Sequence, residues 1–453
     1  MTALLHRDLK SNLPIAVKGE GSYLFDAKSN KYLDACGGAA VASLGHSHPK
    51  VLKAIKAQLD NFSFAHTGFF TNEPAEQLAL KLQQYAPKGF ENARTMFLGS
   101  GSEATEAAIK LARQFHLENG EASRINLISR EYAYHGNTLA ALAVGGHPER
   151  RKPFLPLLLS VGRIPACYPY REQQDGESEA QYGIRAANYL EAEITRLGAE
   201  TVAAFIVEPV SGATLGSVVA AKGYFTRIRE ICDQYGILLI ADEVMCGMGR
   251  TGTMFAIEQE DISPDIITMA KGLAAGYQPL AAVMASDKVV DVILSGSGKL
   301  WNGHTYMSHA VACAGALAVL NVIEDENLIK KVNVQGEKLA NALKQEFLKH
   351  DYVGDIRGRG LFWSLELVQD KVTKQPFDAA LGLAAKFKSA AFENGLLIYP
   401  SSGCIDGTLG DHILLAPPYN ISDTEISEII KMLAITFEQI MPDLASKGKI
   451  NDK

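Results

Sequence analysis

The sequence lacks three features that whole classes of protein require. No apolar run approaches the length of a bilayer span, since the longest, from Val311 to Ile323, is rich in alanine and too short. The opening residues hold no continuous apolar stretch before Arg7 and Asp8, which predicts that no secretory signal is present. The 6 cysteines are scattered without a C-x-x-C pair. We therefore expect reduced thiols and a cytoplasmic protein without membrane contact.

The charge balance argues against a nucleic-acid-binding protein, and the surroundings of a histidine pair argue against a metal site. The chain carries 44 Lys and Arg against 51 Asp and Glu, a formal net charge of -7, and has no basic patch with interleaved aromatics. Nucleic acid is therefore not an expected partner. His46 and His48 are spaced like a metal pair, but no third ligand is near and Pro49 closes the turn. We predict a structural turn there and no metal site.

The order of apolar segments predicts the architecture. The 453 residues, 47% of them hydrophobic, can bury a large core and build two or more domains. Apolar strands at 125–129, 201–207 and 237–241 alternate with helical segments, which predicts an α/β fold with a mostly parallel central sheet and helices on both faces. Beyond about residue 330 the alternation stops, although amphipathic helices at 329–350 and 379–394 continue. This change indicates a smaller α+β domain.

A carboxylate and an amine follow two of the apolar strands. Asp242 comes directly after Ile237–Ala241, and Lys271 follows Ile266–Ala270 and precedes a glycine-containing loop. A partly desolvated lysine has a lowered pKa and can attack a carbonyl to form a Schiff base. In pyridoxal phosphate chemistry a lysine holds the aldehyde as an imine, while an acid pairs with the pyridine nitrogen. Taken singly, however, such residues are more often loop lysines and helix caps.

A glycine- and serine-containing junction offers an anion site. Residues 99–103 read Gly-Ser-Gly-Ser-Glu between a short apolar strand and a helix with small and apolar residues at helical spacing. Bare backbone N–H groups at a helix N-terminus favour a phosphate. Ser100 and Glu103 also have the spacing of a capping box, which would explain the serines without a ligand.

Further polar residues follow other strands. Tyr134 and His135 come after the strand at 125–129, and Glu208 comes after the strand at 201–207. In an open α/β sheet, ligands bind outside the carboxyl ends of the strands. We therefore expect these three residues to share one crevice with Asp242 and Lys271.

Together these motifs resemble the class III (omega) aminotransferases, pyridoxal phosphate enzymes of fold type I. The resemblance rests on Gly99–Ala104, Tyr134–Gly136, Glu208–Pro209, Asp242–Val244, Gly249–Gly252, Lys271–Gly272, Gly303–Thr305 and Arg357–Leu361. It spans almost the entire chain. It implies a large cofactor-binding domain at 56–329, a small domain at 330–453, and an N-terminal segment at 1–55 that joins the small domain.

The resemblance also implies roles at the cofactor. Lys271 would carry the internal aldimine and move the proton between Cα and C4′, and Asp242 would form a salt bridge to the pyridine nitrogen. The remaining cofactor-binding residues would be Gly101 and Ser102 at the phosphate, Tyr134 and Val244 on the two ring faces, His135 beside the ring, and Glu208, which would help to gate the charge of the pocket. Thr305 would reach the phosphate of the partner subunit's cofactor, which implies an obligate homodimer with shared active sites.

By the same resemblance, the reaction is transamination from a primary amine or omega-amino acid to a keto acid such as pyruvate. An aminomutase or another pyridoxal phosphate reaction on this scaffold stays open, as does a non-catalytic protein that binds the cofactor. The acceptor carboxylate calls for a bidentate arginine. Several relatives carry one just after the Pro-Pro strand, but residues 419–425 contain none. Arg163 and Arg171 are possible substitutes, although surface or structural arginines are commoner than arginines that bind a ligand.

Overall fold

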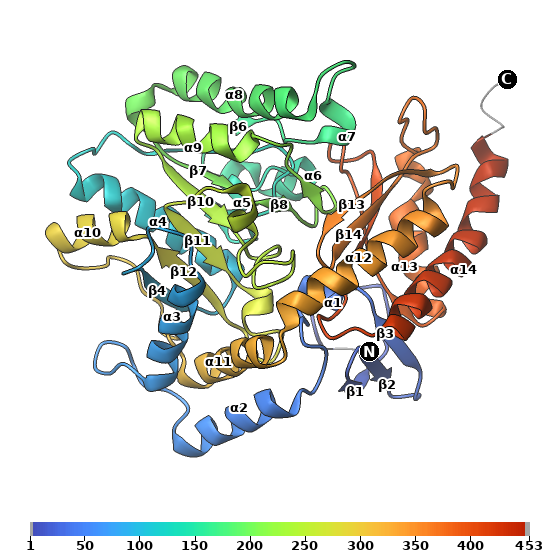
Figure 1. Cartoon of the computed structure of the whole chain (residues 1–453), viewed down its shortest axis with the longest axis horizontal. Coiled ribbons are helices and arrows are strands. Elements are labelled where there is room, and N and C mark those ends of the chain that lie inside the picture. The colour runs from blue at the N-terminus through green and yellow to red at the C-terminus, as the bar shows by residue number, and fades with distance from the viewer. Residues whose placement is uncertain (1–2, 449–453) are drawn as a thin grey trace.

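The computed structural model describes residues 3–448 and is built around a seven-stranded sheet of order β4-β12-β11-β10-β7-β5-β6 (Figure 1). Its strands are β4 (Arg94–Leu98), β5 (Asn126–Arg130), β6 (Gly162–Ile164), β7 (Val202–Val207), β10 (Leu238–Asp242), β11 (Ile266–Met269) and β12 (Ala281–Ala285). All neighbours from β11 to β6 are parallel, and only β12 runs antiparallel to the strands on its two sides. The predicted α/β fold with a mostly parallel sheet is therefore confirmed.

Helices cover both faces of this sheet. Successive side chains of a strand point to opposite faces, and the core divides accordingly. Phe205 and Leu239 pack with helices α8 (Glu179–Leu197) and α9 (Tyr224–Tyr235), among others. Ile206 and Ile240 pack with α4 (Gly101–Glu118) and α10 (Asp287–Ser295). Every residue of β7 and β10 is buried, which explains why 202–207 and 238–241 read as unbroken apolar runs.

The C-terminal part of the chain forms a second layer of structure. Strands β13 (Val353–Arg359), β14 (Phe362–Leu367), β17 (Asp411–Leu415) and β16 (Tyr399–Ser402) make an antiparallel sheet in that order. The helices of this part are α12 (Leu328–Phe347), α13 (Leu383–Glu393) and α14 (Asp423–Gly448). In Figure 1 these orange and red elements lie to one side of the central sheet.

The N-terminal strands lie beside this C-terminal part. A four-stranded sheet has the order β1-β2-β3-β15 and consists of β1 (Ala16–Glu20), β2 (Tyr23–Asp26), β3 (Lys31–Asp34) and β15 (Leu396–Leu397). Leu33 pairs with Leu396 in parallel register, which joins residues far apart in the sequence. The expected boundaries at 55 and 329 fall inside α2 (Pro49–Asn61) and the first turn of α12. The division into domains stays a prediction.

Other helices and short elements complete the fold. Their bounds are α1 (Gly37–Ala40), α3 (Glu73–Tyr85), α5 (Leu139–Val144), α6 (Pro148–Arg151), α7 (Pro169–Glu172), β8 (Val210–Ser211), β9 (Val218–Val219) and α11 (Ala310–Asp325). Within residues 3–448, no helix is long and apolar enough to cross a membrane.

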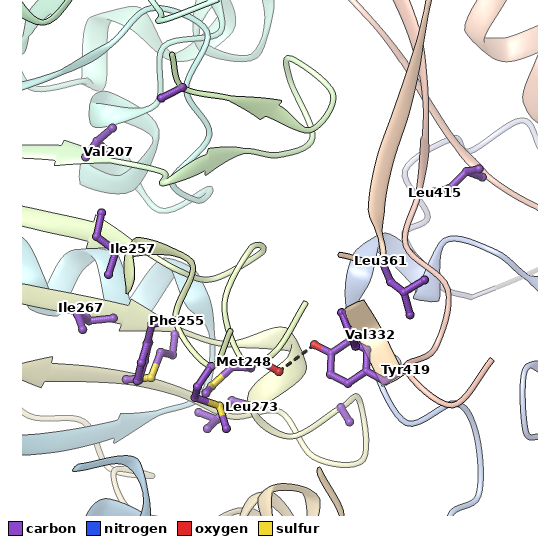
Figure 2. Packing of buried hydrophobic residues seen from close by; sticks show 14 of the residues in the cluster. Val207, Met248, Phe255, Ile257, Ile267, Leu273, Val332, Leu361, Leu415 and Tyr419 are labelled. Atoms are coloured by element: carbon purple, nitrogen blue, oxygen red, sulfur yellow. Dashed lines mark hydrogen bonds between the residues drawn. The ribbon is translucent and has the colours of Figure 1, made fainter. Parts of the chain in front are cut away.

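The segment after β17 is fixed against the loop that follows β10. The Tyr419 hydroxyl donates to the Met248 carbonyl oxygen at 2.9 Å, the contact drawn in Figure 2. The buried Arg250 guanidinium lies 4.6 Å from the centre of the Tyr419 ring and donates to the carbonyl oxygens of Leu361 and Pro417. These contacts tie the C-terminal sheet to the edge of the central sheet where the candidate site lies.

Candidate active site

A cavity of about 480 Å³ opens at the carboxyl ends of the central strands. It is bounded by the residues that directly follow β4, β7 and β11, by the last residue of β10, and by Tyr134 and His135 in the loop after β5. Eight of the nine sequence-predicted site residues line it, namely Gly101, Ser102, Tyr134, His135, Glu208, Asp242, Val244 and Lys271. Thr305 does not, because it lies exposed in the loop before α11. The chain thus brings together all the residues expected from a single subunit.

Lys271 stands at the turn that ends β11. Its backbone has a φ of 43°, a left-handed conformation that is uncommon for a residue other than glycine and is typical of functional sites. Burial lowers the pKa of the Lys271 amine, while the carboxylates of Asp242 and Glu208 act in the opposite direction. Within the described residues, no hydrogen bond or ion pair engages this amine. The amine is therefore available to act as a nucleophile.

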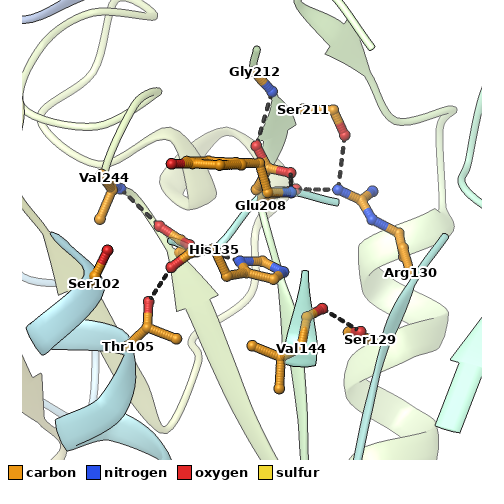
Figure 3. Close-up of polar contacts among 12 residues, drawn as sticks. Ser102, Thr105, Ser129, Arg130, His135, Val144, Glu208, Ser211, Gly212 and Val244 are labelled. Atoms are coloured by element: carbon orange, nitrogen blue, oxygen red, sulfur yellow. Dashed lines mark hydrogen bonds and ion pairs between the residues drawn. The ribbon is translucent and has the colours of Figure 1, made fainter. Parts of the chain in front are cut away.

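Asp242 is held on both oxygens. Its Oδ2 lies 2.6 Å from Nδ1 of His135, and its Oδ1 accepts a hydrogen bond from the backbone N–H of Val244 at 3.0 Å (Figure 3). The carbonyl oxygen of His135 accepts a hydrogen bond from the Thr105 hydroxyl on α4 at 2.7 Å. With Asp242 ionised, Nδ1 is the donor and the histidine fixes the orientation of the carboxylate. Among the described residues, Nε2 of His135 is buried without a partner.

Glu208 binds backbone groups on two sides of the cavity. Its Oε1 accepts from the N–H of Tyr134 at 3.2 Å, and its Oε2 accepts from the N–H of Gly212 at 2.9 Å. Figure 3 shows Arg130 beside it, where the guanidinium donates to the Glu208 carbonyl oxygen and to the Ser211 hydroxyl. Burial raises the pKa of the Glu208 carboxyl, and His135 and Arg130 offset part of this rise. Glu208 thus positions the backbone that carries Tyr134.

The N-terminus of α4 forms one wall of the cavity. Ser100 caps the helix by accepting a hydrogen bond from the Glu103 N–H at 3.2 Å. The Glu103 carboxylate accepts from Gly99 N–H instead of from Ser100 N–H, so only half of the expected capping box forms. Gly101 and Ser102 face the cavity, where unpaired backbone N–H groups and the helix dipole favour an anion.

Arg163 and Arg171, the two possible ligands for a substrate carboxylate, have structural partners instead. Arg163 donates to the backbone oxygens of Val144 at 2.8 Å and Gly145 at 2.9 Å, where α5 ends, and burial lowers its pKa to about 10. Arg171 donates through Nε to the buried Glu366 carboxylate on β14 at 2.6 Å. Neither arginine lines the cavity. Both guanidinium groups are used to hold the fold together.

Several lining residues were missed from the sequence. Val41, Met245, Cys246 and Gln278 also face the cavity. Cys246 has a recognisable signal, since it lies only four residues after Asp242 in a segment already identified. Val41 has none, because its place depends on how the N-terminal segment folds back on the central sheet. Within the described residues, no cluster of His, Cys, Asp and Glu is arranged to hold a metal ion.

Comparisons with known proteins were made for the whole chain. The family profile described as Aminotransferase class-III matches residues 6–437. An uncharacterized aminotransferase of Schizosaccharomyces pombe is 42% identical over 424 residues, which cover 93% of this chain and 92% of the relative. Gamma aminobutyrate transaminase 3, chloroplastic, of Solanum lycopersicum is 37% identical, with 96% of this chain and 82% of the relative covered.

A solved structure agrees over the same length. The amine transaminase from an uncultivated Pseudomonas species, crystallised in its PLP-bound form, superposes with a TM-score of 0.90 at 33% sequence identity. The match covers 97% of this chain and 99% of the other. The likeness therefore extends over the central sheet and the C-terminal part together.

Proposed function

The chain belongs to the class III aminotransferases, and on that premise we propose that it moves an amino group from a primary amine or omega-amino acid to a keto acid such as pyruvate. The observation that carries the proposal is the meeting of Lys271, Asp242 and the N-terminus of α4 in one cavity. A relative named for gamma-aminobutyrate, which is an omega-amino acid, supports this choice of substrate class. Class III aminotransferases depend on pyridoxal phosphate, so the cavity must also accept that group.

The residues present fit pyridoxal phosphate. The Lys271 amine has no partner in the described structure and would bind the aldehyde carbon. Asp242 would pair with the pyridine nitrogen, and the side chains of Tyr134 and Val244 would lie against the two ring faces. Gly101 and the rest of the α4 N-terminus would hold the phosphate. When bound, the cofactor supplies an electron sink for the charge that develops at the substrate Cα.

In the reaction, Lys271 would move one proton, while other residues of the chain would keep Asp242 in place at the pyridine nitrogen. The Lys271 amine would carry the proton between the substrate Cα and C4′ of the cofactor, a task that suits an amine whose pKa is lowered by burial. Asp242 would keep the pyridine nitrogen protonated, and it can do so only while it stays charged and fixed. His135 and the Val244 N–H provide that fixation through bonds of 2.6 and 3.0 Å.

We also propose a homodimer with shared active sites. Trp301 and Tyr306, on either side of Thr305, are 66% and 68% exposed, and Phe69 is 83% exposed. Tyr306 contacts Phe64 with the ring centres 5.7 Å apart, which joins the segments 61–70 and 300–309 into one apolar patch. Exposed aromatic surface of this kind marks an interface. A second copy covering it would receive Thr305 near its own cofactor phosphate.

Spectral half-reactions test the proposed chemistry. The purified protein is loaded with pyridoxal phosphate, its visible absorption is recorded, and primary amines and omega-amino acids are added one at a time. We expect the cofactor band to fade with a donor and to return when pyruvate is added. The Lys271→Ala variant should show neither change. Retained turnover in that variant would refute the assigned role, and turnover of a single amine without any keto acid would indicate an aminomutase.

A further inference from the structure

The cavity lacks a group to bind a substrate carboxylate. Among its described lining residues the only cation is Lys271, whose amine has a chemical task, and the acids Glu208 and Asp242 also face the interior. Tyr419, which directly follows Pro417 and Pro418, is fully buried and donates to the Met248 carbonyl oxygen, so this segment adds no cation to the cavity. The carboxylate of a keto acid therefore needs a cation that is not among the residues lining the cavity.

Arg150 on α6 is placed to supply this charge. Its guanidinium carbon lies 5.1 Å from the centre of the Tyr134 ring, and Tyr134 forms part of the cavity wall. The Arg150 side chain is exposed, and no hydrogen bond or ion pair within residues 3–448 engages its guanidinium. Lys152, two residues on, instead pairs with Glu149 at 3.5 Å. Arg150 thus combines a contact to the cavity wall with N–H groups that are free to bind.

The segment that carries Arg150 is held in place by the C-terminal part of the chain. The loop between β16 and β17 packs on it so closely that a Cβ on Gly403 would stand 2.9 Å from Nε2 of His147. A Cβ on Gly407 would stand 2.8 Å from Cδ of Pro148, the first residue of α6. The side chain of Arg150 therefore starts from a fixed point beside the cavity. Its position follows from the fold and not from a free surface loop.

We propose that Arg150 binds the carboxylate of the substrate at the mouth of the cavity, and that this contact selects keto acids and omega-amino acids over neutral carbonyl compounds and simple amines. The inference rests on the proposed aminotransferase function. A guanidinium and a carboxylate form two parallel charge-assisted hydrogen bonds, which are stronger than the cation–π contact of an exposed arginine.

Binding of small carboxylates tests this without catalysis. Calorimetric titration of the cofactor-loaded protein with propionate and with propionamide separates charge from shape. In the Arg150→Ala variant we expect propionate affinity to fall by roughly 10- to 100-fold, as the loss of a charged hydrogen-bond pair predicts, and propionamide affinity to stay the same. Arg150→Lys should give an intermediate loss, because lysine keeps the charge without the fork. Equal propionate binding by wild type and Arg150→Ala would overturn the proposal.

Turnover then separates this inference from the proposed function. With one amine donor, Arg150→Ala should raise the KM for pyruvate by roughly 10- to 100-fold at nearly constant kcat and leave the KM for butanal unchanged. Lys152→Ala, on the same segment, is the matched control and should change neither. Equal losses with pyruvate and butanal would refute a carboxylate contact. A wild-type protein that binds propionate but transfers no amino group would instead refute the aminotransferase proposal.

Discussion

Replacing Gly136 by alanine should loosen the phosphate end of the cavity. Gly136 has a φ of 135°, and an added Cβ would come within 2.6 Å of the Ser102 hydroxyl and 2.9 Å of both Ser102 Cα and Ala141 Cβ. The hydroxyl can rotate away, but the other two atoms cannot. Overpacking costs about 1–3 kcal/mol, and a side chain at such a φ about 1–3 kcal/mol more, so the folded state loses roughly 4 kcal/mol.

Part of this strain can be relieved if the first turn of α4 moves away from Gly136. Because that turn carries Gly101 and Ser102, the relief removes the groups proposed to hold the phosphate. If about 2.7 kcal/mol of the strain is relieved in this way, cofactor affinity falls by about 100-fold. Titration with pyridoxal phosphate, followed by visible absorption, measures this loss, and the thermal midpoint measures the remaining destabilisation.

Gly89→Ala is the matched control for this change. Gly89 also has a positive φ, 87°, but no atom lies within 4 Å of its added Cβ. We expect a small drop in the thermal midpoint and unchanged cofactor affinity. If Gly136→Ala bound the cofactor as tightly as the wild type, the close packing of Gly136 against Ser102 would not matter for binding and the reasoning would be refuted.

Three further predictions concern buried groups near the site. Burial raises the pKa of Glu243 from 4.5 to about 7, so the folded protein binds this proton more tightly than the unfolded chain does. The Glu243 contribution to stability should therefore fall by about 3 kcal/mol as pH rises from 4.5 to 7. To measure it, the unfolding free energies of the wild type and Glu243→Gln are compared across this pH range, and their difference should fall by the same amount. A difference that does not change with pH would contradict the prediction. Tyr419→Phe removes the donor to the Met248 carbonyl oxygen. This change should lower the unfolding free energy, measured by urea titration, by about 1–3 kcal/mol. An unchanged unfolding free energy would show that this hydrogen bond does not stabilise the fold. Cys246 lines the cavity, but burial raises the pKa of its thiol well above the usual value. Iodoacetamide should therefore label Cys246 far more slowly at pH 8 than it labels a small-molecule thiol in solution. Rapid labelling of Cys246 would refute this prediction.

The sequence was informative wherever burial alone determines a pattern. Strands β7 and β10 are covered on both faces, so they are apolar up to Val207 and Ala241, and the acids that come next, Glu208 and Asp242, could be placed at one edge of the sheet. The antiparallel direction of β12 could not be predicted, because a buried antiparallel strand has the same apolar sequence pattern as a buried parallel one.

The partners of polar side chains could not be predicted in this way. Asp242 and His135 are 107 residues apart, and their bond exists only because β5 and β10 both flank β7. The same limit applies to Arg163, whose structural role could not be decided from the sequence because the carbonyl groups that bind it gather only when α5 ends beside β6. Arg150 was overlooked because Pro-Glu-Arg-Arg reads as an ordinary charged surface segment. Its relation to Tyr134 is purely tertiary.

The central claim is that the Lys271 amine binds the cofactor, and one measurement tests it most directly. The protein loaded with pyridoxal phosphate is reduced with borohydride, which makes a C=N bond to the cofactor permanent, and the digested peptides are analysed by mass spectrometry. The account predicts a phosphopyridoxyl group on Lys271 in the wild type and none in the Lys271→Ala variant. A stable modification of a different lysine, or no modification of the loaded protein, would contradict it.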